Sequence, residues 1–164
     1  MKIQTEYITA VLLFFPLLII QITIVPLIAI NGVIPDLIII LLVYYTLQLG
    51  QVEGAVLGFV YGLFYDLITG GLLGSSMLSK VLTGFIVGYF FSENKKHIYL
   101  KSYIFPLIVL LGSTIDSFIL SFFSTIELNT NVAGLFVKQG LLPGIYTAVF
   151  SIIVIIFYPR RSLE

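Results

Sequence analysis

The amino-acid sequence predicts an all-α membrane protein, built as a bundle of about six transmembrane helices. Three observations support this prediction: 59% of the 164 residues are hydrophobic, only 10% are charged, and long uncharged runs alternate with short polar breaks. A soluble domain would carry roughly 25% charged residues. No break is long enough to hold a second folded unit, so a single integral membrane domain is expected over residues 1–164.

The first helix is expected at residues 8–30, because this stretch contains no charged residue. With a rise of about 1.5 Å per residue, a helix of this length crosses a hydrocarbon layer of roughly 30 Å. A cleaved signal peptide is the alternative. The apolar run is long for a signal peptide, however, and it lacks small residues in an A-x-A arrangement at its end.

Five further helices are expected where apolar runs are bounded by glycine, proline, asparagine or charged residues. These runs are residues 37–49, 54–68, 77–91, 103–123 and 141–157. The run 37–49 is short for a membrane span, since it forms only about 20 Å of helix. It either crosses the bilayer while wrapped by neighbouring helices, or forms a re-entrant hairpin with the segment that follows.

Basic residues predict the orientation, because Lys and Arg concentrate in the cytoplasmic loops of membrane proteins. Both termini are expected to be cytoplasmic. In this orientation only Lys138 flanks an outer end, and the cytoplasmic side carries Lys2, Lys95, Lys96, Lys101, Arg160 and Arg161.

Glycine recurs every four residues along the third expected helix and again along the fourth. The positions are Gly50, Gly54, Gly58 and Gly62, then Gly84 and Gly88. In lipid, helices associate largely through close backbone approach along such faces. The pattern therefore predicts a groove that receives another helix, either from this chain or from a partner protein.

Four ionisable residues lie within or beside the apolar runs: Asp36, Asp66, Lys80 and Asp116. Each needs a partner, since a charge at the bilayer centre costs about 2.5 to 3.5 kcal/mol on insertion scales. A short loop joins the helices that carry Asp66 and Lys80, so these two are expected to form an ion pair. Asp116 lies among serines and is expected to pack through hydrogen bonds, with a proton or ion path as the alternative.

Enzymatic, metal-binding and nucleic-acid functions have little support in this composition. Cysteine is absent and His97 is the single histidine, so zinc sites and Cys/His catalysis lack their ligands. The net charge is zero, which leaves no basic surface for nucleic acid. No G-x-S-x-G, H-E-x-x-H or P-loop motif occurs, and no cofactor is expected.

Three motifs stand out between Pro35 and Tyr89: Pro35-Asp36-Leu37, Gly58-Phe59-x-x-Gly62-Leu63-x-x-Asp66 and Leu78-Ser79-Lys80. Through these motifs the region resembles the MreD family of rod-shape-determining proteins. The resemblance implies a multi-pass protein of the bacterial cytoplasmic (inner) membrane, with a non-enzymatic role in cell elongation and peripheral cell-wall synthesis.

The same resemblance implies partners. These are the single-span protein MreC, bound directly, and indirectly MreB, a RodA-type glycosyltransferase and a class B penicillin-binding protein. The family fold is similar to the substrate-binding S components of energy-coupling-factor transporters, so vitamin uptake is the alternative function. The absence of Trp and the scarcity of small residues in the first expected helix favour the scaffold over a vitamin binder.

Overall fold

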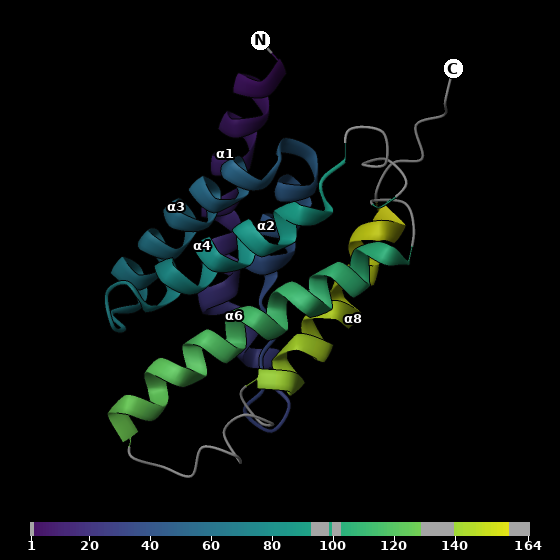
Figure 1. Ribbon diagram of the computed structural model, residues 1–164. Coiled ribbons are helices and arrows are strands. Elements are labelled where there is room, and N and C mark those ends of the chain that lie inside the picture. The colour runs from purple at the N-terminus through teal and green to yellow at the C-terminus, as the bar shows by residue number, and fades with distance from the viewer. Residues whose placement is uncertain (1, 93–98, 100–102, 129–139, 158–164) are drawn as a thin grey trace.

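The computed structural model describes residues 2–92, 99, 103–128 and 140–157, and the regular elements in these ranges are all helical (Figure 1). The all-α prediction is therefore confirmed for this part of the chain. The α-helices are α1 (Lys2–Thr23), α2 (Leu37–Leu49), α3 (Gln51–Thr69), α4 (Ser75–Val87), α6 (Ile104–Leu128) and α8 (Leu142–Phe157), and two short 3-10 helices are η1 (Val25–Ile28) and η2 (Gly88–Phe90).

The first helix ends earlier than the sequence predicted. The expected range 8–30 is wrong at both ends, because α1 begins at Lys2 and ends at Thr23, and η1 follows it. Pro26 lies at the start of η1 and has no backbone N–H to extend the hydrogen bonds of α1, although Pro16 is accommodated inside the same helix. The range 77–91 is also too long, since α4 ends at Val87 and gives way to η2.

Three helical segments of the described chain are long and apolar enough to cross a membrane: Glu6–Thr23, Gln51–Thr69 and Ile104–Phe123. Two shorter apolar helices, Leu37–Leu49 and Leu142–Ile153, accompany them. Six crossings and cytoplasmic termini stay predictions. Apart from Lys2, the basic residues that predicted the orientation lie outside the described residues.

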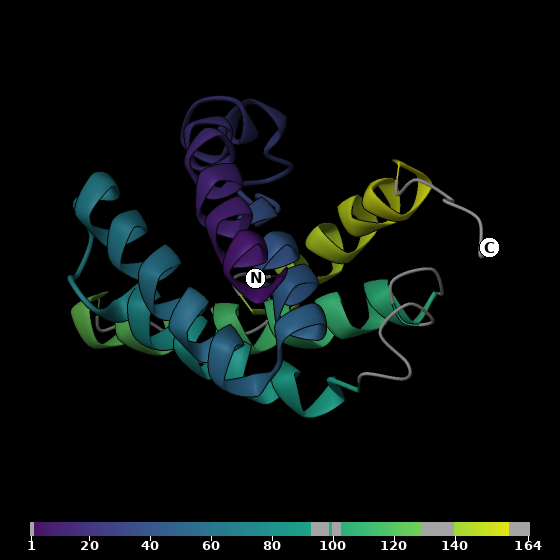
Figure 2. The same cartoon turned by 90° about the horizontal axis from the view of Figure 1, so that it is seen from above.

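The short helix α2 lies at the centre of the bundle (Figure 2). It contacts α1, α3, α4, α6 and α8. Its side chains are largely buried, and the fully enclosed ones include Ile38, Ile39, Leu42, Val43 and Leu47. Its neighbours therefore cover this short helix, as both a wrapped crossing and a re-entrant hairpin require, and the choice between the two stays a prediction.

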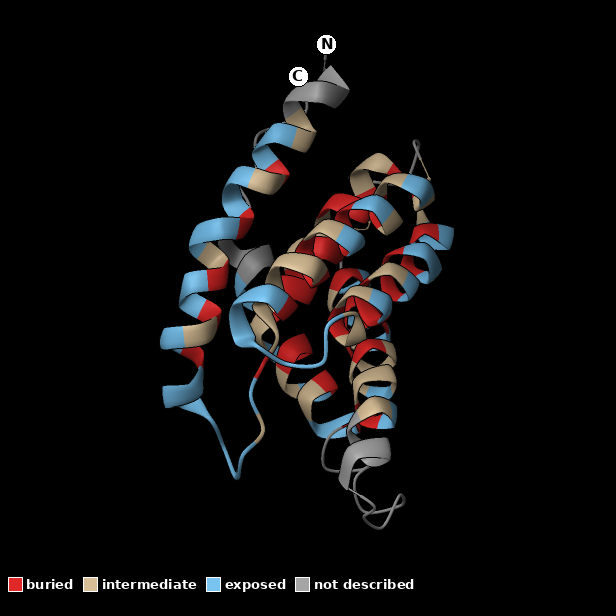
Figure 3. Ribbon diagram, turned by 90° about the vertical axis from the view of Figure 1, so that its left-hand side faces the viewer, coloured by how far each residue is buried: buried red, intermediate tan, exposed pale blue. Residues whose placement is uncertain are grey.

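Helix α1 lies at the periphery, with its exposed residues facing outward (Figure 3). Its inner face packs against α3 through Phe14, whose ring stacks on the ring of Tyr61 with 4.4 Å between centroids. The hydroxyl of Tyr61 donates a hydrogen bond of 3.0 Å to the carbonyl of Ala10. A fully buried phenol therefore has a partner for its polar end.

Helices α3 and α4 form a close antiparallel hairpin (Figure 1), and α4 occupies the glycine groove. A Cβ at Gly58 would overlap the backbone carbonyl of Lys80, and a Cβ at Gly62 would overlap the backbone of Met77. Gly54 and Gly84 approach each other's carbonyls in the same way. The groove predicted from the sequence therefore receives a helix of this chain.

The two remaining glycines of the predicted groove differ in role. Gly88 lies against the backbone of Gln51, so it extends the contact between the two helices. Gly50 lies outside the groove, because it forms the turn between α2 and α3. Its φ of +120° is one that other residues rarely adopt.

Replacing Gly58 with alanine is expected to destabilise the bundle by about 1 to 3 kcal/mol, the usual cost of overpacking, because backbone atoms rather than a side-chain end would have to move. The free energy of unfolding can be measured in detergent micelles by SDS titration. Circular dichroism is the suitable signal, since the chain has no Trp.

The matched control is Gly71→Ala, since a Cβ there would meet only the Thr69 hydroxyl at 3.9 Å. The control should unfold at the wild-type SDS concentration. Equal stability of the Gly58 variant and the control would contradict the close packing of α3 on α4.

Candidate functional site

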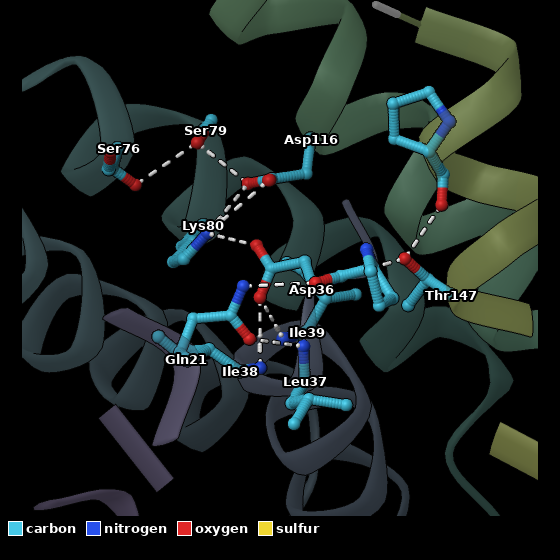
Figure 4. A network of polar contacts seen from close by, with 12 residues as sticks. Gln21, Asp36, Leu37, Ile38, Ile39, Ser76, Ser79, Lys80, Asp116 and Thr147 are labelled. Atoms are coloured by element: carbon cyan, nitrogen blue, oxygen red, sulfur yellow. Dashed lines mark hydrogen bonds and ion pairs between the residues drawn. The ribbon is translucent and has the colours of Figure 1, made fainter. Parts of the chain in front are cut away.

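A buried cluster of three charged residues joins α2, α4 and α6 (Figure 4). The ammonium of Lys80 lies 3.1 Å from Oδ2 of Asp36, and 3.4 Å and 3.3 Å from the two carboxylate oxygens of Asp116. The side chains of Lys80 and Asp116 are 1% and 3% exposed, whereas that of Asp36 is 24% exposed. The ring of Tyr65 lies 5.5 Å from the same ammonium.

Hydrogen bonds connect the cluster to neighbouring helices. The hydroxyl of Ser79 donates to Oδ1 of Asp116 at 2.7 Å. The backbone N–H of Asp36 donates to the hydroxyl of Thr147 on α8 at 2.9 Å, and that hydroxyl donates to the carbonyl of Pro143. Because every link is buried or partly buried, the cluster ties α8 to the same centre as α4 and α6.

Asp36 also begins the central helix. Its Oδ1 accepts the backbone N–H groups of Ile38 at 2.9 Å and Ile39 at 3.1 Å, which makes it the N-cap of α2. The side chain of Gln21 on α1 makes two further hydrogen bonds at the N-terminus of α2. It donates to the carbonyl of Pro35 and accepts the N–H of Leu37, both at 2.9 Å.

The predicted ion pair between Asp66 and Lys80 is wrong. The carboxylate of Asp66 instead accepts three backbone N–H groups at the start of α4, from Gly74 at 2.8 Å and from Ser76 and Met77 at 3.2 Å each. The N-cap of α4 is Gly74, which has no side chain to accept these donors. Asp66 takes that role from the preceding helix, and a negative charge is favourable at a helix N-terminus.

The network includes three residues that the sequence did not single out, Gln21, Tyr65 and Thr147, and Ser79, which was noted only as part of the family-like motif. A glutamine inside a long apolar run was a usable signal, because lipid cannot satisfy an amide. Serine and threonine give no comparable signal, since their hydroxyls can bond to the carbonyl four residues earlier in any helix. Of the serines near Asp116, Ser113 and Ser121 are buried and Ser117 is half-buried.

Comparison with known proteins gives one family. The family model described as rod shape-determining protein MreD matches residues 1–161. No curated protein and no solved structure matches the chain.

Replacing Lys80 with methionine is expected to destabilise the protein by about 3 to 5 kcal/mol, because two carboxylates would be left in a buried site without their cation. The triple variant Lys80→Met, Asp36→Asn, Asp116→Asn should recover part of this loss, since it removes the charges together. SDS titration of the single, paired and triple variants measures the coupling. Strictly additive changes in the free energy of unfolding would contradict energetic coupling among the three charges.

Replacing Asp66 with alanine is expected to cost about 1 to 2 kcal/mol, in the upper range for loss of an N-cap, since three N–H groups of α4 would lose their acceptor. Hydrogen exchange should show faster exchange at Ser76 and Met77 while α2 stays protected. Unchanged exchange at the start of α4 would disprove the capping role.

Proposed function

This chain belongs to the MreD family of rod shape-determining proteins, and we propose that it acts in that role as a non-enzymatic membrane scaffold that binds a single-span MreC-like protein. Through this partner it is connected indirectly to MreB, a RodA-type glycosyltransferase and a class B penicillin-binding protein. The observation that carries the proposal is the match over residues 1–161, because it covers nearly the whole chain rather than one segment. The match gives no support to the vitamin-uptake alternative.

The proposed location is the bacterial cytoplasmic membrane, with the chain crossing it several times and both termini inside. Three long apolar helices and two shorter ones support a multi-pass arrangement. The buried contacts of α2 support its inclusion among the crossings, since its neighbours cover it from lipid.

The partner helix is proposed to dock on the outer surface of the bundle. The glycine groove is unsuitable, because α4 already fills it. Large apolar side chains are exposed on the outer faces of several helices, among them Leu12 on α1, Val56 on α3, Phe118 on α6 and Val149 on α8. One of these faces would exchange lipid for the partner helix.

Co-expression of this chain with the MreC-like protein of the same genome tests the proposal. Purification through a tag in mild detergent, followed by native mass spectrometry, should yield a complex of defined stoichiometry. An unrelated single-span protein expressed at the same level is the control. Recovery of the chain without its partner, or equal recovery of both single-span proteins, would refute the scaffold role.

A photoreactive amino acid placed in turn at Leu12, Val56, Phe118 and Val149 would locate the docking face, since these four exposed positions lie on different helices. If the partner docks on one face, the positions on that face should cross-link to it and the others should not. Cross-linking of similar yield from all four would indicate contact by random collision in the membrane.

A further inference from the structure

A partly open cavity of about 230 Å³, lined by both polar and apolar residues, lies beside the charged cluster. The loop before α2, the second half of α6 and the start of α8 form its wall, together with Gln21 of α1 and Tyr65 of α3. Asp36 and Asp116 contribute carboxylates, Ser117 contributes a hydroxyl, and Leu120 and Pro143 contribute apolar surface. Figure 4 shows the two carboxylates on either side of Lys80. The cavity therefore borders the most strongly charged part of the described bundle.

The charges around the cavity do not balance. Two carboxylates face one ammonium, so the cluster carries one excess negative charge when both acids are ionised. The ammonium of Lys80 is enclosed, whereas the side chain of Asp36 is 24% exposed and lines the cavity. Oδ1 of Asp36 accepts two N–H groups of α2 and Oδ2 contacts Lys80, so the exposed edge of this carboxylate is the side from which a further cation would offset the remaining charge.

The wall favours an organic cation over a metal ion. Metal ions need a shell of several oxygen, nitrogen or sulfur ligands. Among the described residues, no three His, Cys, Asp or Glu side chains lie close enough together to hold one. A primary ammonium donates up to three hydrogen bonds, which suit the carboxylate of Asp36 and the hydroxyl of Ser117. Its carbon chain can contact Leu120 and Pro143, which a hydrated metal ion cannot use.

We propose that this cavity binds a small primary alkylammonium group, with Asp36 as its ionic partner. The inference goes beyond the scaffold role and is independent of it. Two sources can supply the group: a soluble amine, or the headgroup of phosphatidylethanolamine. Their shared chemistry is a protonated primary amine that donates several hydrogen bonds.

The purified full-length protein in detergent provides the first test. Its melting temperature is followed by circular dichroism during titration with ethylammonium chloride, and with sodium chloride and tetramethylammonium chloride at equal ionic strength. A saturable rise with ethylammonium alone is expected, because ligand binding to the folded state stabilises it by mass action. Tetramethylammonium has the same charge but no N–H donor. Equal responses to all three salts would overturn the proposal.

Two variants of the cavity wall and one control make the test specific. Asp36→Asn removes the excess charge but leaves an oxygen to cap α2 and leaves Lys80 paired with Asp116. Ser117→Leu fills the cavity, and is independent of the charged cluster should Asp36→Asn fail to fold. Phe118→Leu is the control, since Phe118 lies outside the cavity wall and is 45% exposed.

The dissociation constant for ethylammonium is expected to rise at least tenfold in both cavity variants, and to stay at the wild-type value in the control. A response retained in Ser117→Leu, or lost equally in Phe118→Leu, would show that the cation acts elsewhere.

Native mass spectrometry distinguishes the two sources. Preferential retention of phosphatidylethanolamine over phosphatidylcholine, reversed by ethylammonium and lost in Ser117→Leu, assigns the group to the lipid. Saturable binding of ethylammonium without any lipid preference assigns it to a soluble amine. Absence of both effects overturns the proposal, while leaving the co-purification test of the scaffold role unaffected.

Discussion

The ionic contact of Lys80 with Asp36 and Asp116 is the constraint on which the arrangement of the helices depends. A buried ion costs several kcal/mol in desolvation unless well-placed partners compensate it, so Lys80 is tolerated only where both carboxylates reach it. Each partner belongs to a different helix, and Asp36 also caps α2. Moving any one of these helices would therefore separate charges as well as apolar side chains. Apolar contacts alone would specify the arrangement less strictly, because lipid competes with them on equal terms.

Lys80 belongs both to the glycine groove and to the charged cluster. The backbone carbonyl of Lys80 lies against Gly58, while its side chain extends to α2 and α6. The missing side chain at Gly58 sets how closely α4 approaches α3, and this distance positions the ammonium between the carboxylates. Asp66 adds a third contact between the two helices by capping α4. The family-like motif from Gly58 to Lys80 therefore serves internal structure in large part.

This use of the motif bears on how a rod shape-determining protein of this family can recruit a partner. The glycines that suggest a docking groove in the sequence are already packed against α4, so the proposed partner would have to use the exposed apolar faces of α1, α3, α6 or α8. A closely packed interior suits the proposed scaffold role, since it fixes the outer faces of the helices relative to one another. The cavity beside Asp36 is one place where the described helices do not pack closely.

The sequence by itself determined the helical membrane class, the family resemblance, the range of α2 and the close approach of two helices along the glycines. These properties depend on local composition and spacing, so the apolar runs and the four-residue spacing of the glycines are enough to predict them. Only the tertiary structure decided which charges pair. Proximity along the chain predicted that Asp66 would pair with Lys80. The start of α4 has no side-chain cap at Gly74, however, and the carboxylate of Asp66 accepts its backbone N–H groups instead. Lys80 instead reached Asp36 and Asp116, which lie 44 and 36 residues away in the chain. Pairing of this kind depends on which helix faces meet, and no single segment carries that information.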